Sequence, residues 1–153
     1  MGNWLYNNKE ITESDIPDNA IGFVYLIRHT PSKKYYIGKK SLSSNRNVLI
    51  GKRELQRIKE ERKKLGIPGR LPVKKKVSKY SNWKEYYSSN EIIKKMVSAD
   101  KSDEFERHII RFCSSRKSLS YYELKFQIMY NVLEDDNSWN ENILGKYFKK
   151  DLI

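Results

Sequence analysis

The chain has 153 residues and a formal net charge of +12, and apolar residues make up 38% of it. This length suits one compact domain with a real core, and no run of about eighteen apolar residues is present to cross a membrane. A single cysteine, Cys113, excludes an internal disulfide and a cysteine-based zinc finger. We therefore expect a soluble protein that is intracellular and cytoplasmic.

The first elements along the chain are an N-terminal arm and a β-hairpin. Residues 1–20 are mostly polar after Trp4, which indicates an arm that packs loosely ahead of a main domain at 21–153. Residues 21–28 and 35–39 are rich in β-branched and aromatic residues, and the polar stretch between them contains a proline. Alternation along the first strand predicts apolar residues on both of its faces.

A basic segment follows the hairpin. From Arg46 to Lys84 there are fourteen Lys or Arg and three Glu, a net charge of +11. Residues 52–65 predict a helix with one narrow apolar stripe, and the prolines and glycines after it favour an irregular basic stretch up to Lys79. We treat residues 47–82, as approximate bounds, as an insertion in the main domain. Such concentrated charge indicates a polyanionic partner, although a solvated helix face and loop would have the same composition.

The remaining elements complete an α+β fold. They are a short helix at 91–98 capped by Ser89 or Asn90, a strand at 105–113, a long helix at 120–134 and a final helix at 140–149. The aromatic residues Trp83, Tyr86 and Tyr87 either belong to the core or stack on nucleic-acid bases. Together the elements predict a small three-stranded antiparallel sheet flanked by helices, with the basic insertion after the hairpin.

Two short motifs on the hairpin are the most informative part of the chain. One is Gly22-Phe23-Val24-Tyr25, and the other is Tyr36-Ile37-Gly38. They resemble the motifs of the GIY-YIG nuclease family, although Phe23 stands where that family often has glycine. The resemblance covers about residues 20–46 and 105–142. It implies a three-stranded sheet and a small endonuclease of the phage or mobile-element type, with homing endonucleases among the candidates.

The resemblance also implies a set of site residues. The family commonly has a lysine directly after the second motif, an arginine about ten residues after its tyrosine, and a glutamate on a later helix that precedes an asparagine. By position the catalytic set is Tyr25, Tyr36, Lys39, Arg46, Glu123 and Asn140, with Asn131, Asn137 and Asn142 as alternatives to the last.

Each assignment has a chemical reason. Glu123 is expected to ligate Mg²⁺, with Mn²⁺ as a substitute, because Mg²⁺ prefers oxygen and is held by one or two carboxylates plus substrate phosphate. Tyr25 is the expected general base, with its pKa lowered by the positive charge of Lys39. Tyr36 would hydrogen-bond the phosphate or the attacking water, and the planar fork of Arg46 would bind phosphate oxygens.

Each assignment also has a purely structural alternative. The pattern from Ser120 to Glu123 matches a capping box, in which the glutamate merely binds a backbone amide. The two tyrosines could be half-buried residues whose hydroxyls are satisfied across the hairpin. Arg46 could be one more surface arginine, and Asn140 an ordinary helix cap.

Duplex DNA is the predicted partner, a membrane is not, and a homodimer stays open. The residues expected to contact the DNA backbone are Lys40, Lys52, Arg53, Arg70, Lys74, Lys75 and Lys76. The sequence thus predicts a metal-dependent DNA endonuclease that hydrolyses phosphodiester bonds. The alternative is a non-catalytic nucleic-acid-binding protein on the same scaffold.

Overall fold

The computed structural model describes residues 2–152, and within that range the side chains of residues 44–46 and 76–80 lie outside the description. The chain forms two compact units. The sheet unit comprises residues 1–42 and 81–153, and the ribbon unit comprises Ser43–Tyr80. Thirteen Lys or Arg and three Glu give the ribbon unit a net charge of +10, so only +2 remains for the larger sheet unit.

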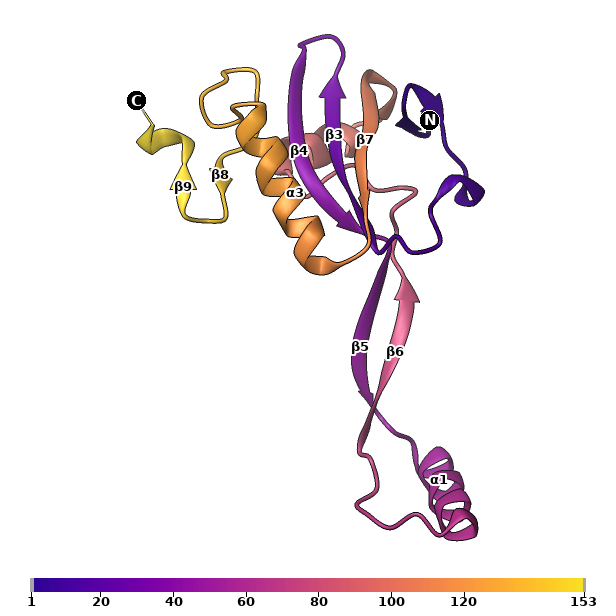
Figure 1. Ribbon diagram of the computed structural model, residues 1–153. Coiled ribbons are helices and arrows are strands. Elements are labelled where there is room, and N and C mark those ends of the chain that lie inside the picture. Colours follow the sequence, from indigo (N-terminus) through magenta and orange to yellow (C-terminus); the bar gives the residue numbers. More distant parts are fainter. Residues whose placement is uncertain (1, 153) are drawn as a thin grey trace. The chain divides into compact units, whose positions relative to one another are not determined.

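A mixed five-stranded sheet forms the centre of the sheet unit, in the order β2-β1-β7-β3-β4 (Figure 1). The strands are β1 (Trp4–Tyr6), β2 (Lys9–Glu10), β3 (Gly22–His29), β4 (Lys34–Ser41) and β7 (Phe105–Cys113). β3 pairs antiparallel with both β4 and β7, as predicted, but β1 pairs parallel with β7. The prediction of three strands was therefore incomplete. Asn7 and Asn8 adopt positive φ angles in the tight turn that joins the two additional strands, a conformation that asparagine tolerates.

The N-terminal segment belongs to the core rather than to a loosely packed arm. Trp4 is only 2% exposed, and its ring packs edge-on against those of Phe23 and Tyr25. The buried guanidinium of Arg107 donates to the carbonyls of Gly2, Lys84 and Tyr86. A buried cation needs such acceptors. The Arg107 side chain of β7 therefore connects the N-terminal segment to residues 84–86.

Apolar side chains cover both faces of the sheet, as the alternation in the hairpin predicts. Phe23, Tyr25 and Ile27 lie in one core cluster, and Val24 lies in the other with Ile37. The first cluster includes Ile93 of α2 (Glu91–Ser98), and the second includes Leu119 of α3 (Arg116–Met129). Gly22 of β3 permits the close approach of α3, because a Cβ there would lie 2.7 Å from Leu119.

Two elements near the C-terminus differ from the prediction. α3 begins after Ser115, whose hydroxyl accepts from the Ser118 N–H, so the helix starts four residues earlier than expected and ends at Met129. The final helix is replaced by a small hairpin of β8 (Asn142–Ile143) and β9 (Tyr147–Phe148). Leu144 and Gly145 adopt positive φ angles at its turn, which a helix cannot accommodate.

The ribbon unit consists of a two-stranded antiparallel ribbon and one helix. β5 (Ser43–Leu49) pairs with β6 (Lys74–Tyr80), and α1 (Lys52–Leu65) has the predicted bounds. Gly66 ends α1 in the left-handed conformation. The two strands were not predicted, and β6 occupies part of the stretch that was expected to be irregular up to Lys79. Among residues 2–152, no helix combines the length and apolar character that spanning a membrane requires.

Candidate active site

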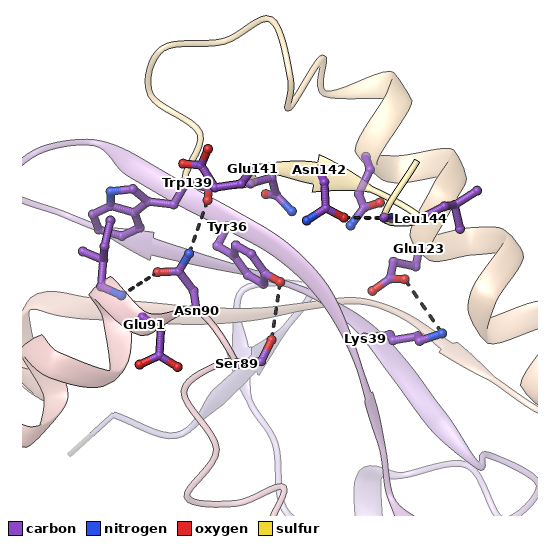
Figure 2. Close-up of a pocket in the computed structure, with 14 residues that line it drawn as sticks. Tyr36, Lys39, Ser89, Asn90, Glu91, Glu123, Trp139, Glu141, Asn142 and Leu144 are labelled. Carbon is purple, nitrogen blue, oxygen red and sulfur yellow. Dashed lines mark hydrogen bonds and ion pairs between the residues drawn. The ribbon is translucent and has the colours of Figure 1, made fainter. Parts of the chain in front are cut away.

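One pocket of about 610 Å³ lies at the outer edge of β4, the outermost strand of the main sheet. Tyr36 and Lys39 of β4, Glu123 of α3 and Asn140 of the segment after α3 line it. Figure 2 shows Glu123 and Lys39 together on one side of the pocket, and Asn90 and Trp139 on the other. Four of the six predicted catalytic residues are thus brought together by three different parts of the chain.

Backbone groups on the outer edge of β4 bind the segment after α3, which lines the other part of this pocket. Tyr35 exchanges backbone hydrogen bonds with the segment after α3, because its N–H donates to Asn137 and its carbonyl accepts from Trp139. Alternate residues of a strand present their backbone groups to the same edge. Ile37 and Lys39 therefore follow Tyr35 along the edge that faces the pocket.

Asn140 continues this pairing with its side chain. Its Oδ1 accepts from the Ile37 N–H at 3.0 Å, and its Nδ2 donates to the Ile37 carbonyl at 2.8 Å. Asn140 is only 2% exposed. Its side-chain amide binds the backbone of β4 in the same way as the peptide group of a neighbouring strand would. It does not cap a final helix, because a β-hairpin stands there.

Glu123 lies one step further along the same edge. Because α3 is already capped at Ser115, Glu123 sits within the helix, and the capping-box alternative does not apply. Its side chain is 20% exposed, and its Oε1 lies 3.9 Å from the Lys39 Nζ. Burial raises the pKa of Glu123, while the Lys39 ammonium and backbone N–H act in the opposite direction. Burial is the larger effect.

Lys39 is held between two groups of α3. Its Nζ donates to the Ser120 Oγ at 3.0 Å, in addition to its ion pair with Glu123. The Lys39 side chain is 42% exposed, so its ammonium still reaches the solvent of the pocket. A cation beside a half-buried carboxylate is suited to binding an anionic substrate and to keeping that carboxylate ionised.

The two motif tyrosines occupy different environments. The Tyr36 hydroxyl lies in the pocket, 3.5 Å from the Ser89 hydroxyl, and burial raises its pKa. Tyr25 is 1% exposed and lies behind Tyr36, with its hydroxyl 3.5 Å from that of Tyr86. Burial raises the pKa of Tyr25 well above its ordinary value. The expectation that Lys39 lowers this pKa was wrong, because desolvation dominates.

The other predicted contacts are divided between the two units. The Nζ of Lys40 lies over the Tyr86 ring and donates to Asn82, whereas Trp83 and Tyr87 are buried in the core. The side chains of Arg46 and Lys76 lie outside the described residues. The ribbon unit presents the rest as exposed side chains, namely Lys52, Arg53, Arg70, Lys74 and Lys75. Lys75 differs from the others because its ammonium lies 2.5 Å from the Glu54 carboxylate.

Over residues 4–150 the chain matches the family model described as "Putative endonuclease segE, GIY-YIG domain". The chain belongs to this GIY-YIG family. No curated protein and no solved structure matched it. Membership in this family of endonuclease domains implies nuclease activity on DNA. The match extends over nearly the whole chain, including most of the segment expected to be a separate arm.

The residues of this GIY-YIG domain fit a divalent cation bound by few protein ligands. Among the described residues, no group of three or more His, Cys, Asp and Glu side chains is placed to hold a metal ion. Glu91, Glu123 and Glu141 all line the pocket, and the carboxylate of Glu123 lies 3.9 Å from the Lys39 Nζ. One carboxylate suits Mg²⁺, which keeps several waters and binds substrate phosphate.

Gln127 is a residue of the site that was not predicted. It is buried, lines the pocket and donates to the Ile37 carbonyl at 3.1 Å. Met129, an apolar residue of the same helix, is instead 61% exposed, so apolar character alone does not identify the buried face of α3. A polar amide one helical turn after Glu123 is the sequence signal that could have revealed it.

Proposed function

We propose that this protein is a Mg²⁺-dependent endonuclease that hydrolyses phosphodiester bonds of duplex DNA at the pocket beside β4. The observation that carries the proposal is the convergence of Tyr36, Lys39, Glu123 and Asn140 on that pocket, within a chain that belongs to the GIY-YIG family. Within the GIY-YIG family, the small phage or mobile-element nucleases, homing endonucleases among them, are the type we favour.

In this proposal Glu123 would hold the metal ion, and Mn²⁺ would replace Mg²⁺. A bound Mg²⁺ supplies a Lewis acid and a more acidic water molecule. Burial alone would favour the protonated form of Glu123, which binds no cation. The ammonium of Lys39 opposes this effect on the pKa and so helps to keep the ligand ionised.

Hydrolysis requires that a water oxygen attack phosphorus and lose a proton, while the bond from phosphorus to one ester oxygen breaks and that ester oxygen takes up a proton. The protonated phenol of Tyr36 would donate a hydrogen bond to a non-bridging phosphate oxygen, and Lys39 would stabilise the added negative charge. Asn140 would hold the backbone between these two side chains. Tyr25 remains a catalytic candidate, in a protonated form that supports the position of Tyr36.

The ribbon unit would provide most of the affinity for DNA. Its net charge of +10 lies in 38 residues, whereas the sheet unit carries +2. Contacts of lysine and arginine with phosphates release condensed counterions and do not depend on base sequence. We therefore assign backbone binding to Lys52, Arg53, Arg70 and Lys74, which are exposed.

Supercoiled plasmid incubated with Mg²⁺ or with a chelator tests this function. We expect metal-dependent nicked or linear products, and we expect Glu123→Gln to abolish them while DNA binding persists. Glu134→Gln is the matched control, because Glu134 is exposed and does not line the pocket. Binding without cleavage on a varied set of plasmids would instead favour the non-catalytic nucleic-acid-binding protein.

A further inference from the structure

Two side chains of α3 contact the edge of β4 at consecutive outward-facing positions. Gln127 Nε2 donates to the Ile37 carbonyl at 3.1 Å. The carboxylate of Glu123, four residues earlier, lies with its Oε1 3.9 Å from the Nζ of Lys39. The helix and the strand therefore run in opposite directions along this contact.

The spacings of the two elements match. Four residues of an α-helix advance about 6 Å along its axis, since the rise is about 1.5 Å per residue. Two residues of a strand advance about 6.6 Å. Glu123 and Gln127 can therefore engage Lys39 and Ile37 at the same time only in this one register of α3 on β4. A shift by one helical turn would break both contacts.

We propose that Gln127 is a positioning residue that holds Glu123 at the pocket. Gln127 is 7% exposed, and its amide would lose a partner inside the protein if α3 moved away from Ile37. The side chain of Glu123 is partly exposed, and its Oε1 lies 3.9 Å from the Lys39 Nζ. The contact of Glu123 with Lys39 is therefore weaker than that of Gln127 with Ile37. The buried amide sets the register, and the carboxylate is placed as a result.

Asn140 does not make Gln127 redundant. Both amides donate to the Ile37 carbonyl, but Asn140 belongs to the segment after α3 and fixes only the strand and that segment. Of the described contacts to the Ile37 carbonyl, the one from Gln127 is the contact made by α3. Loss of Gln127 should therefore leave β4 in place and remove one of the contacts that hold α3, and with it Glu123, against that strand.

Amide hydrogen exchange tests this role without metal or DNA. In Gln127→Met, which keeps the side-chain length but removes the donor, we expect the Lys39 amide to exchange about ten-fold faster, because α3 is no longer fixed beside the outward-facing edge of β4. The amides of Tyr36 and Gly38 point toward β3 and should keep their protection. Ile128→Met is the matched control, since the neighbouring Ile128 is 58% exposed.

Metal affinity gives a second readout that rests on the proposed function. Mn²⁺ binding should weaken about ten-fold in Gln127→Met, a loss typical of outer-shell residues. If Gln127→Met does not fold, Gln127→Asn keeps a polar group but shortens its reach, and the same changes are expected. Unchanged Lys39 exchange together with unchanged Mn²⁺ affinity would overturn the proposal. If the wild-type protein cuts no DNA but Gln127→Met still has faster exchange at the Lys39 amide, the positioning role of Gln127 is supported and only the nuclease function is refuted.

Discussion

The hydroxyl of Tyr25 lies against the Cα of Gly38 on the neighbouring strand. A Cβ on Gly38 would fall 2.6 Å from that oxygen and 2.9 Å from the Tyr36 ring, closer than any stable contact. The strand pairing places these residues directly opposite each other. The glycine of the second motif is therefore explained by the tyrosine of the first.

Replacing this glycine should displace both tyrosines. We expect Gly38→Ala to lower the free energy of unfolding by about 1–3 kcal/mol, as overpacking in a core does. DNA cleavage should fall by more than about ten-fold, because Tyr36 would leave its position in the pocket. Urea unfolding and plasmid cleavage measure the two effects. Gly51→Ala is the control, since a Cβ on Gly51 would have no neighbour within 4 Å.

The two motif tyrosines should differ in their importance for the chemical step. Tyr36→Phe should lower the single-turnover cleavage rate about 100-fold, as loss of one hydrogen-bond donor to a developing charge does. Tyr25→Phe should have a smaller effect, because its hydroxyl is buried and its pKa is raised. Rates at saturating DNA from pH 6 to 10 compare them. A larger loss in Tyr25→Phe than in Tyr36→Phe would return the role of general base to Tyr25.

Charge in the ribbon unit should control the salt dependence of DNA binding. Replacement of Lys52, Arg53 and Lys74 by glutamine should reduce the slope of log K against log salt by up to roughly 2.7, from about 0.9 per lost phosphate contact. Lys75→Gln should change the slope less, because its ammonium is already paired with Glu54. Binding titrations at several salt concentrations measure the slope. Lys101→Gln, in the sheet unit, serves as the control, and an unaltered slope in the triple variant would place the DNA elsewhere.

Two hydrogen bonds to the Asp135 carboxylate should make stability depend on pH. The Tyr35 hydroxyl donates to Asp135 Oδ2 at 2.7 Å, and the Asn137 N–H donates to Oδ1 at 2.9 Å. These donors lower the pKa of Asp135 in the folded protein. A lowered carboxyl pKa contributes stability above the unfolded value of about 3.9, and this contribution is lost as the pH falls through the folded value.

We therefore expect Asp135→Asn to reduce stability at pH 7 and to flatten its decline below pH 4. Urea midpoints of the wild type and the variant from pH 7 to pH 2 provide the measurement. Asp136→Asn is the neighbouring control, because Asp136 is exposed. An identical acid-induced decline in wild type and Asp135→Asn would contradict the assigned cause.

The local sequence by itself determined the elements whose signals lie within a few residues. Alternation in β3 predicted which side chains belong to each face, and the apolar spacing and flanking glycines predicted α1. These predictions succeeded because strand and helix periodicities are local properties of the chain. The family resemblance also assigned Tyr36, Lys39 and Glu123 to one site; the three side chains line one pocket, and their catalytic roles stay predictions.

Only the tertiary structure decided which groups meet at the edge of β4 and what their environments are. The parallel pairing of β1 with β7 and the burial of Trp4 depend on Arg107, a residue about one hundred positions away. The raised pKa of Tyr25 follows from burial by segments distant in sequence. The contact of Gln127 with Ile37 joins residues 90 positions apart. Desolvation and side-chain hydrogen bonds depend on the packed neighbours, and the sequence pattern of one element does not contain them.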